Sequence, residues 1–470
     1  MGKNKVKKGI IQIFLGNLIF LIFGILNNFI LPKYLSVDSY ALIKTYLLYI
    51  SYASLLAGGY VEGMFLYYGG KTVEETYHLK FGNNFHTFFW FQGVISLLVF
   101  LIGVLLKKYI ILLFAIGVFT TNIVSYFKNY STAVGEFKIY SVSTSIEKIL
   151  VFIFNAAFIF MFRADNYILY VAVIMVVSII EIIYFFIKLE GKQKGLFSGN
   201  FKLNEITHCM NMGVILLIGN SISALFVGID QWFVKFLMAN TDFALYSFAV
   251  SMERIVVIFI TPITTVLYNF FCKKNEDSQV AFVRETLVLW GFAILMAVFP
   301  LIWVVKTFIP NYADALSVTA ILFCGQALNC IINGVYVNVL KAQKRQKQFL
   351  IQMIMMTILA IILNIIAYYI VGNIVGLAYA TLITKIIWLI ICQIECKEYR
   401  YSMNVNIALI LLIICFIFCS IINNYILGGL LYLLIFLVIT MVFMRNSFIK
   451  VIIEVKGYVT NLLFNKNKMR

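Results

Sequence analysis

The chain has 470 residues, of which 63% are hydrophobic and 12% are charged, and its formal net charge is +17. Soluble domains carry roughly 45–50% apolar and about 25% charged residues, so this composition excludes a soluble globular protein. The positive charges lie in short loops between long apolar blocks. They therefore indicate the positive-inside bias of a membrane protein and not binding to nucleic acid.

The N-terminal half contains six apolar segments after a basic start, MGKNKVKK. Each is about 20 residues long, the length at which a helix crosses the hydrocarbon core. The first is too long for a signal-peptide core and is expected to remain as an uncleaved span. The expected spans are 10–31, 41–68, 83–106, 109–130, 141–162 and 166–189. Residues 1–190 are thus predicted to form an N-terminal six-helix lobe, followed by a cytoplasmic linker at 191–206.

The C-terminal half repeats this pattern and then adds two spans. Its expected spans are 207–229, 243–271, 281–305, 315–340, 349–370, 373–395, 405–424 and 426–445. We predict an all-α polytopic membrane protein with about fourteen transmembrane helices. Two pseudo-symmetric six-helix lobes surround a central cavity, and the second lobe covers 207–400. An additional helix pair at 401–446 precedes a basic cytoplasmic tail at 447–470.

The distribution of Lys and Arg predicts the orientation. With the N-terminus inside, 27 of the 37 basic residues fall in inner segments and six in outer loops. This alternation predicts a multi-pass membrane protein with both termini in the cytoplasm. The Ile-, Phe-, Asn- and Lys-rich composition indicates a bacterial gene, for which the expected location is the inner membrane. The loops are too short for a catalytic or nucleotide-binding domain, and no P-loop is present. Neither catalytic activity, a cofactor nor a metal site is expected, since the three His are scattered and no CxxC occurs.

An internal repeat links the two halves. A shift of 203 residues places FLGNLIFLIFGILNNFI over LIGNSISALFVGIDQWF without a gap, with Gly16–Asn17 on Gly219–Asn220. The shift equals six spans, so both repeats start on the same side of the membrane. Parallel repeats of this kind commonly enclose a substrate site between the halves.

Besides the basic residues counted with the inner and outer segments, four lie inside predicted spans, where a charge costs about 2.5–3.5 kcal/mol and usually marks a cavity or an ion pair. Lys385 lies near the middle of its span, and both explanations stay open for it. Arg254 follows Glu253, so a structural pair is the alternative to a cavity position. Lys148 and Lys44 lie nearer to span ends and could instead extend to the interface. All four are candidates for binding an anionic substrate such as a phosphate or pyrophosphate headgroup.

Several acidic residues lie at similar depth and are candidates for carrying a coupling ion or for forming ion pairs. Glu62 lies in GGYVEGMF, whose three Gly permit close packing or an unwound turn. Asp230 has the alternative of capping the outer end of its helix. Whether the coupling ion is a proton or Na⁺ stays open. The full set is Glu181, Glu147, Glu62, Glu253 and Asp230.

Several stretches resemble the polysaccharide repeat-unit flippases (Wzx type) of the multidrug/oligosaccharidyl-lipid/polysaccharide (MOP) exporter superfamily. They are LPKYLSVDSYALIKTYLLYISYASLLAGGYVEGM, ALYSFAVSMERIV, FIPNYADALSVTAIL, VLKAQKRQK and NIVGLAYATLITKIIW. The resemblance covers nearly the whole chain, although each motif is loose. It implies alternating access and transport of an undecaprenyl-pyrophosphate-linked oligosaccharide for O-antigen, capsule or exopolysaccharide synthesis. The implied partners are this anionic lipid-linked substrate, membrane lipid and a polysaccharide polymerase.

Three other functions remain as alternatives. An ion-coupled multidrug exporter of the same superfamily typically has twelve spans and often takes cationic substrates, which the internal Lys and Arg disfavour. A lipid II exporter also has fourteen spans, but the arginine cluster expected in its first loop is absent. A polysaccharide polymerase belongs to another class and needs a large outer loop, which is not found in this sequence.

Overall fold

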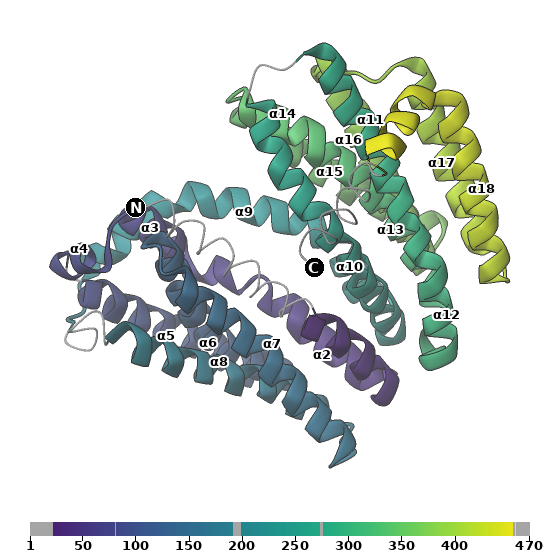
Figure 1. Cartoon of the computed structure of the whole chain (residues 1–470). Coiled ribbons are helices and arrows are strands. Elements are labelled where there is room, and N and C mark those ends of the chain that lie inside the picture. Colours follow the sequence, from purple (N-terminus) through teal and green to yellow (C-terminus); the bar gives the residue numbers. More distant parts are fainter. Residues whose placement is uncertain (1–21, 80, 191–198, 273–275, 455, 457–470) are drawn as a thin grey trace, which may run out of the picture. The chain divides into compact units, whose positions relative to one another are not determined.

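The structure is a computed structural model. It describes residues 22–79, 81–190, 199–272, 276–454 and 456. The described chain is helical throughout (Figure 1) and contains twelve helices that are long and apolar enough to cross a membrane. These twelve correspond to predicted spans two to seven and nine to fourteen. The prediction of an all-α polytopic membrane protein is therefore confirmed.

The two remaining spans differ from these twelve. Most of the first, 10–31, lies outside the described residues, and its described part is helical over 22–34. The predicted eighth span, 243–271, corresponds to α10 (Asn240–Phe271), a helix of 32 residues that carries Glu253 and Arg254 near its middle. Much of the linker predicted at 191–206 and most of the tail predicted at 447–470 also lie outside the described residues.

The chain forms two compact units. Unit 1 comprises Met1–Gln231 with Ala239–Ala244, and unit 2 comprises Trp232–Met238 with Leu245–Arg470. The long helix α9 (Leu203–Leu237) thus belongs to unit 1 for most of its length. Whether the chain divides into the six-helix lobes expected from the sequence stays a prediction.

Unit 1 is built around α6, which packs against α5, α8, α3 and α2. Its helices before α9 are α2 (Val37–Ile50), η1 (Ala53–Ala57), α3 (Tyr60–Tyr68), α4 (Val73–His78), α5 (Phe81–Leu105), α6 (Tyr109–Ala133), α7 (Phe137–Phe160) and α8 (Tyr167–Glu190).

Aromatic side chains make up much of the core of unit 1. The ring of Phe81 stacks on that of Tyr130, with centroids 4.0 Å apart, and Phe88 stacks on Tyr126 at 4.9 Å. Phe127 stacks on Phe185 of α8 at 5.5 Å. Aromatic pairs in such geometries contribute about 0.5–1.5 kcal/mol beyond the area that they bury. The high Phe and Tyr content of the chain thus serves packing as well as contact with lipid.

The second span is broken near its middle. The α-helical part α2 ends at Ile50, the 3₁₀ helix η1 follows, and Gly58 and Gly59 adopt positive φ angles of 60° and 84° before α3 begins at Tyr60. Only glycine adopts this backbone conformation without steric cost. The predicted span 41–68 is therefore not one uninterrupted helix. The unwound turn that the glycines were noted to permit is present.

Two buried amide side chains satisfy the backbone that this break leaves unpaired. Asn122 Nδ2 donates to the Ala53 carbonyl at 3.0 Å, and Gln92 Nε2 donates to the Leu56 carbonyl at 3.3 Å. Asn122 also donates to Gln92 Oε1 at 2.9 Å. Non-helical backbone at membrane depth persists only where protein or water replaces the missing bonds, and these two amides do so here.

Unit 2 is centred on α13 (Ala315–Ile331), which packs against α16 (Ile374–Glu395), α11 (Asp277–Ile294) and α17 (Met403–Ile421). A π-helical segment, η4 (Ile332–Val337), continues α13 into α14 (Asn338–Ala342). Its other elements are η2 (Leu295–Ala297), α12 (Val298–Phe308), η3 (Pro310–Tyr312), α15 (Gln346–Ile370), η5 (Lys397–Tyr399) and α18 (Tyr425–Phe443).

Candidate functional site

Unit 1 contains a cluster of four charged side chains from α6, α7 and α8. Lys128 Nζ lies 2.7 Å from Glu147 and 3.0 Å from Glu181, and Lys148 Nζ lies 2.8 Å from the other oxygen of Glu147. Ser143 Oγ donates to Glu181 Oε1 at 2.6 Å. The cluster, Lys128, Glu147, Lys148 and Glu181, contains equal numbers of opposite charges, so its members compensate one another inside the membrane.

The members of this cluster differ in accessibility. The Glu181 side chain is 1% exposed, whereas Lys128, Glu147 and Lys148 are 18%, 27% and 28% exposed. Sequence reasoning selected three of the four but counted Lys128 among the inner-loop cations. The predicted span 109–130 contains Lys128 near its inner end, and in the structure α6 continues to Ala133, so this lysine lies five residues before the end of the helix. Lys148 forms an ion pair with Glu147 within this cluster, an interaction that extension to the membrane interface alone would not require.

Glu62 lies in the first turn of α3, directly after the break in the second span. Its carboxylate interacts with the Asn220 side chain of α9 and with its own backbone N–H. The other oxygen, Oε2, is buried and accepts no hydrogen bond from the residues that the structure describes. A buried carboxylate oxygen without a hydrogen bond is costly unless a proton, a cation or water reaches it.

Close packing of backbones holds α3 against α9 next to Glu62. A Cβ built on Gly63 would lie 1.8 Å from the Cys209 carbonyl oxygen, and one on Gly213 would lie 2.0 Å from the Gly59 carbonyl oxygen. Neither distance leaves room for a side chain. These small residues fix α9, and with it Asn220, at the start of α3.

In unit 2 a deep ion pair joins α10 and α16. Lys385 Nζ lies 3.4 Å from Glu253 Oε1, and both side chains are about one-tenth exposed. Gln326 Nε2 of α13 donates to the same Glu253 oxygen at 2.6 Å. The Lys385 side chain lies against Gly325, where an added Cβ would be 3.1 Å from Nζ. The ion-pair alternative noted for Lys385 is therefore what the structure presents, with the acid supplied by Glu253.

An amide ladder continues from this ion pair along α13. Asn329 Nδ2 donates to Gln326 Oε1 at 3.0 Å, and Asn333 Nδ2 donates to Asn329 Oδ1 at 2.6 Å. Asn333 lies in the π-helical segment, a local geometry that is frequent at functional sites. Sequence reasoning missed all three amides. Their spacing of three and four residues, which places them on one helix face, was the available signal.

Arg254 differs from its neighbour Glu253 in environment. Adjacent residues on a helix point in different directions, and while Glu253 is buried, Arg254 is exposed. No ion pair involving Arg254 occurs among the described residues. The structural Glu253–Arg254 pair that was the alternative interpretation is therefore not formed. This leaves a guanidinium near the middle of α10 that lacks an acidic partner in the described chain.

The remaining candidates, Lys44 and Asp230, belong to unit 1. Lys44 Nζ donates to Asn28 Oδ1 at 3.4 Å and lies 5.1 Å from the centre of the Tyr40 ring. Asp230 is buried, and its Oδ1 accepts a hydrogen bond from the Gln231 N–H at 2.8 Å. Because α9 continues to Leu237, Asp230 does not cap the helix end.

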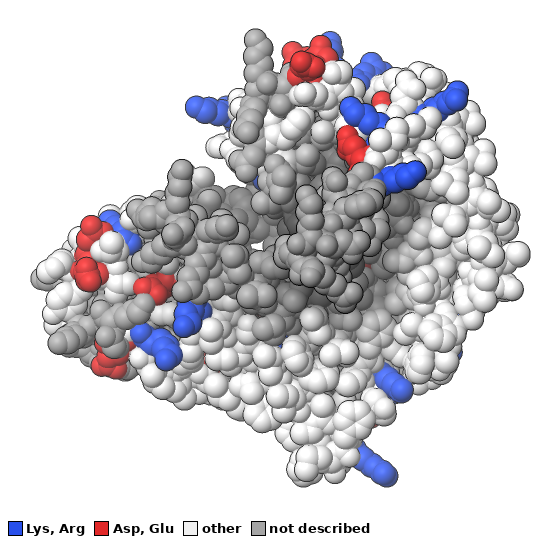
Figure 2. Space-filling view, viewed as in Figure 1, with Lys and Arg blue, Asp and Glu red and all other residues white. Residues whose placement is uncertain are grey.

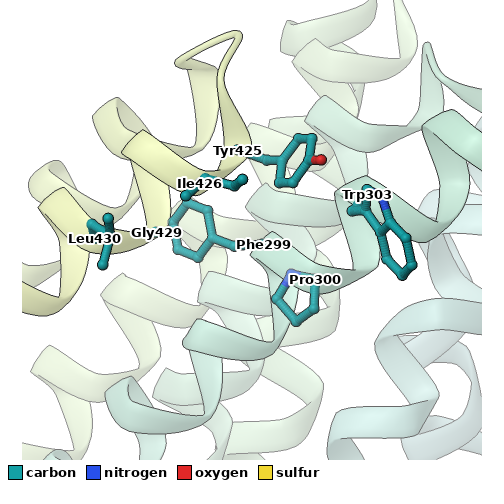
Figure 3. Close-up of a pocket in the computed structure, with 7 residues that line it drawn as sticks. All are labelled: Phe299, Pro300, Trp303, Tyr425, Ile426, Gly429 and Leu430. Carbon is teal, nitrogen blue, oxygen red and sulfur yellow. The ribbon is translucent and has the colours of Figure 1, made fainter.

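An open apolar pocket lies between α12 and α18 (Figure 3). Phe299, Pro300 and Trp303 face the α18 residues Tyr425, Ile426, Gly429 and Leu430. Its lining includes neither a charged side chain nor any of the candidate residues. The pocket suits an apolar group, and the polar chemistry of unit 2 lies elsewhere.

On the face seen in Figure 2, broad areas of the described surface carry no Lys, Arg, Asp or Glu side chain. This arrangement is expected of helices that contact lipid along their flanks. Among the described residues, no group of three or more His, Cys, Asp or Glu could hold a metal ion.

Comparison with known proteins places these features in a family context. Residues 6–274 match the model of a family described as polysaccharide biosynthesis protein. An uncharacterized membrane protein of Methanocaldococcus jannaschii is 28% identical over 251 residues. That alignment covers 49% of this chain and 48% of the relative, so the chain matches about half the length of this curated protein.

Solved structures show the same fold. An inward closed conformation of the lipid II flippase MurJ superposes with a TM-score of 0.67 at 15% identity, covering 93% of this chain and 99% of that one. An inward-facing multidrug resistance MATE family transporter of the MOP superfamily gives a TM-score of 0.54 at 13% identity, covering 82% and 95%. At such identities the likeness concerns the fold alone.

Proposed function

Since the chain belongs to the polysaccharide biosynthesis protein family and has the fold of flippases and transporters of the MOP superfamily, we propose that it is a flippase for a lipid-linked oligosaccharide. The substrate is an undecaprenyl-pyrophosphate-linked repeat unit for O-antigen, capsule or exopolysaccharide. It moves from the inner to the outer leaflet of a bacterial inner membrane by alternating access. Both termini of the chain lie in the cytoplasm.

Arg254 is the observation that carries this proposal. Its side chain is exposed near the middle of a spanning helix and has no acidic partner in the described chain. A charge facing lipid at this depth costs about 2.5–3.5 kcal/mol on insertion scales, so a hydrated space is the favourable environment for it. A guanidinium pairs with phosphate through two parallel hydrogen bonds, and this geometry suits a pyrophosphate headgroup.

The lysines contribute in a different way because their charges are already compensated. Lys148 and Lys128 hold the two oxygens of Glu147 in unit 1, and Lys385 holds Glu253 in unit 2. We expect Lys148 to attract substrate phosphate as a secondary site and Lys385 to keep Glu253 charged. Lys44 is a further candidate contact.

For the coupling ion we propose Glu62. The other acids of the candidate set are engaged: Glu147, Glu181 and Glu253 each lie in an ion pair, and Asp230 accepts a backbone hydrogen bond. Glu62 Oε2 is buried without a partner in the described residues, which favours an exchangeable proton or Na⁺ on this carboxylate.

A lipid II exporter is the second candidate function. The fold likeness to the lipid II flippase extends over 93% of this chain. Both substrates are polyprenyl pyrophosphates that carry sugars, so the same cationic chemistry would serve either of them. The two candidates differ in which lipid accumulates when the protein is absent.

Deletion of the gene followed by complementation tests the proposal. We expect loss of surface polysaccharide and accumulation of a lipid-linked oligosaccharide on the cytoplasmic leaflet, both reversed by the wild-type gene. Arg254→Ala should fail to restore polysaccharide, Arg254→Lys should restore part of it, and Arg400→Ala, a change of an exposed loop arginine, should restore it fully. Normal polysaccharide with accumulated lipid II would favour the second candidate. Altered drug sensitivity alone would contradict both.

A further inference from the structure

The span formed by α13, η4 and α14 is the most buried of the twelve apolar helices, yet it contains two half-buried positions. Between Val318 and Leu340 every side chain is buried except those of Asn329 and Asn333. Both positions are amides, and they lie one turn apart on the same helix face. The packing around this span is therefore incomplete only at these two asparagines, and the side chains left partly accessible there are polar.

Lipid does not account for this incomplete packing. Where a helix of unit 2 does face lipid, its exposed side chains are apolar, as α18 shows with Leu430, Leu434 and Val438. An amide in contact with acyl chains would lose its hydrogen bonds to water without replacement, at a cost of about 1–3 kcal/mol. Asn329 and Asn333 are half-buried amides, so a hydrated space is the environment that favours them.

The ladder also has a direction. Each amide donates toward the ion pair: Asn333 to Asn329, Asn329 to Gln326, and Gln326 to the Glu253 carboxylate. Hydrogen bonds in such a chain polarise one another. At the far end, Asn333 Oδ1 accepts no hydrogen bond from the described residues, and each asparagine keeps one N–H that the ladder does not use. The ladder therefore leaves one acceptor and two donors unengaged.

We propose that Asn329 and Asn333 bind hydroxyl groups of a sugar, and that this ladder recognises the glycan of the lipid-linked substrate. The proposal rests on the proposed function. An alternating set of donors and acceptor matches vicinal hydroxyls, which both donate and accept. An anion is disfavoured because the Glu253 carboxylate terminates the ladder. A hard cation is disfavoured because it requires six or more oxygen ligands, and only one amide oxygen is unengaged.

A binding comparison with two lipids tests this site in the full-length protein. The probes are bare undecaprenyl pyrophosphate and the lipid-linked oligosaccharide purified from the deletion strain, each added to protein in nanodiscs. We expect wild-type protein to prefer the glycosylated lipid by about tenfold, the scale of one or two net hydrogen bonds. Asn333→Leu and Asn329→Leu should each reduce this preference to threefold or less and leave affinity for the bare lipid unchanged.

Asn364→Leu is the matched control, because Asn364 of α15 is fully buried and bonds only within its own helix, to the Ala360 carbonyl. It should keep the full preference. Binding of the bare lipid confirms that each variant is folded, and Asn333→Ala repeats the test should the leucine variant not fold. Full preference in the Asn329 and Asn333 variants would overturn the sugar site alone, as would equal affinity of wild-type protein for both lipids. No binding of either lipid to wild-type protein would overturn the proposed function as well.

Discussion

The paired charges inside the spans have their effect through the partners that compensate them. Glu253 illustrates this, since one of its oxygens receives both the Lys385 ammonium and the Gln326 amide. From sequence, the depth of Lys385 marked it as important, but its partner lies 132 residues away and was not identifiable. Depth in a span can be read from a sequence, whereas the pairing of charges depends on which helices pack together.

Replacing one member of this ion pair should destabilise the protein more than replacing both. Lys385→Ala leaves the Glu253 carboxylate buried and unpaired, at an expected cost of about 3–5 kcal/mol, and should weaken transport although the protein still inserts. Lys385→Met combined with Glu253→Gln removes both charges and should recover most of the stability. Thermal unfolding in detergent measures the stabilities, and surface polysaccharide at matched expression measures transport. Equal unfolding temperatures for all three proteins would show that the pair is not structurally important.

At the level of helices, sequence periodicity located most elements well. Twelve predicted spans correspond to helices. A run of about 20 apolar residues in a membrane forms a helix because the helix satisfies all backbone hydrogen bonds within the segment. What the periodicity could not show was the break in the second span and the π-helical segment after α13. Neither feature interrupts the apolar pattern of the sequence. The amides that stabilise the break, Gln92 and Asn122, come from α5 and α6.

The glycine contact between α3 and α9 provides a prediction at this scale. Gly63→Ala places a methyl group 1.8 Å from the Cys209 carbonyl oxygen, so the two helices must separate, with an expected destabilisation of about 1–3 kcal/mol. Gly219→Ala, also on α9, meets nothing within 4 Å and should be neutral or slightly stabilising. The unfolding temperature of each variant in detergent measures the difference. A Gly63→Ala variant as stable as Gly219→Ala would mean that the close contact is absent in the membrane.

For the whole molecule, the sequence offers two predictors that average over many residues, the charge distribution and the internal repeat. The repeat relates helices of the two units: the 203-residue shift places Glu181 of α8 on Thr384 of α16, next to Lys385. In unit 1 the ion-paired residue is Glu181 at this repeat position, and in unit 2 it is Lys385, one residue after the equivalent position. The sequence does not show that the cluster of unit 1 contains four charged side chains and the ion pair of unit 2 only two. The number of partners depends on how the helices pack around each position.

Topology can be measured at two exposed turns. Lys107 and Lys344 are exposed residues with φ angles of 53° and 59°. Lys107 lies in the turn between α5 and α6, and Lys344 lies in the turn between α14 and α15. In a Cys272→Ser background, which removes the exposed cysteine, Lys344→Cys should react with an impermeant maleimide only from the cytoplasm. Lys107→Cys should react only from outside. The reverse pattern would invert the orientation that the Lys and Arg distribution predicts.

The broken second span has a consequence for deuterium exchange. A continuous helix protects its amides by a ladder of i→i−4 hydrogen bonds, whereas the first N–H groups of α3 have no carbonyl one turn behind them. The neighbouring α6 has an unbroken ladder over 25 residues. Peptides covering residues 51–62 should therefore take up deuterium well before peptides from the middle of α6, although both lie at similar depth. Isotope uptake would thus report, without any mutation, when water reaches the carboxylate of Glu62.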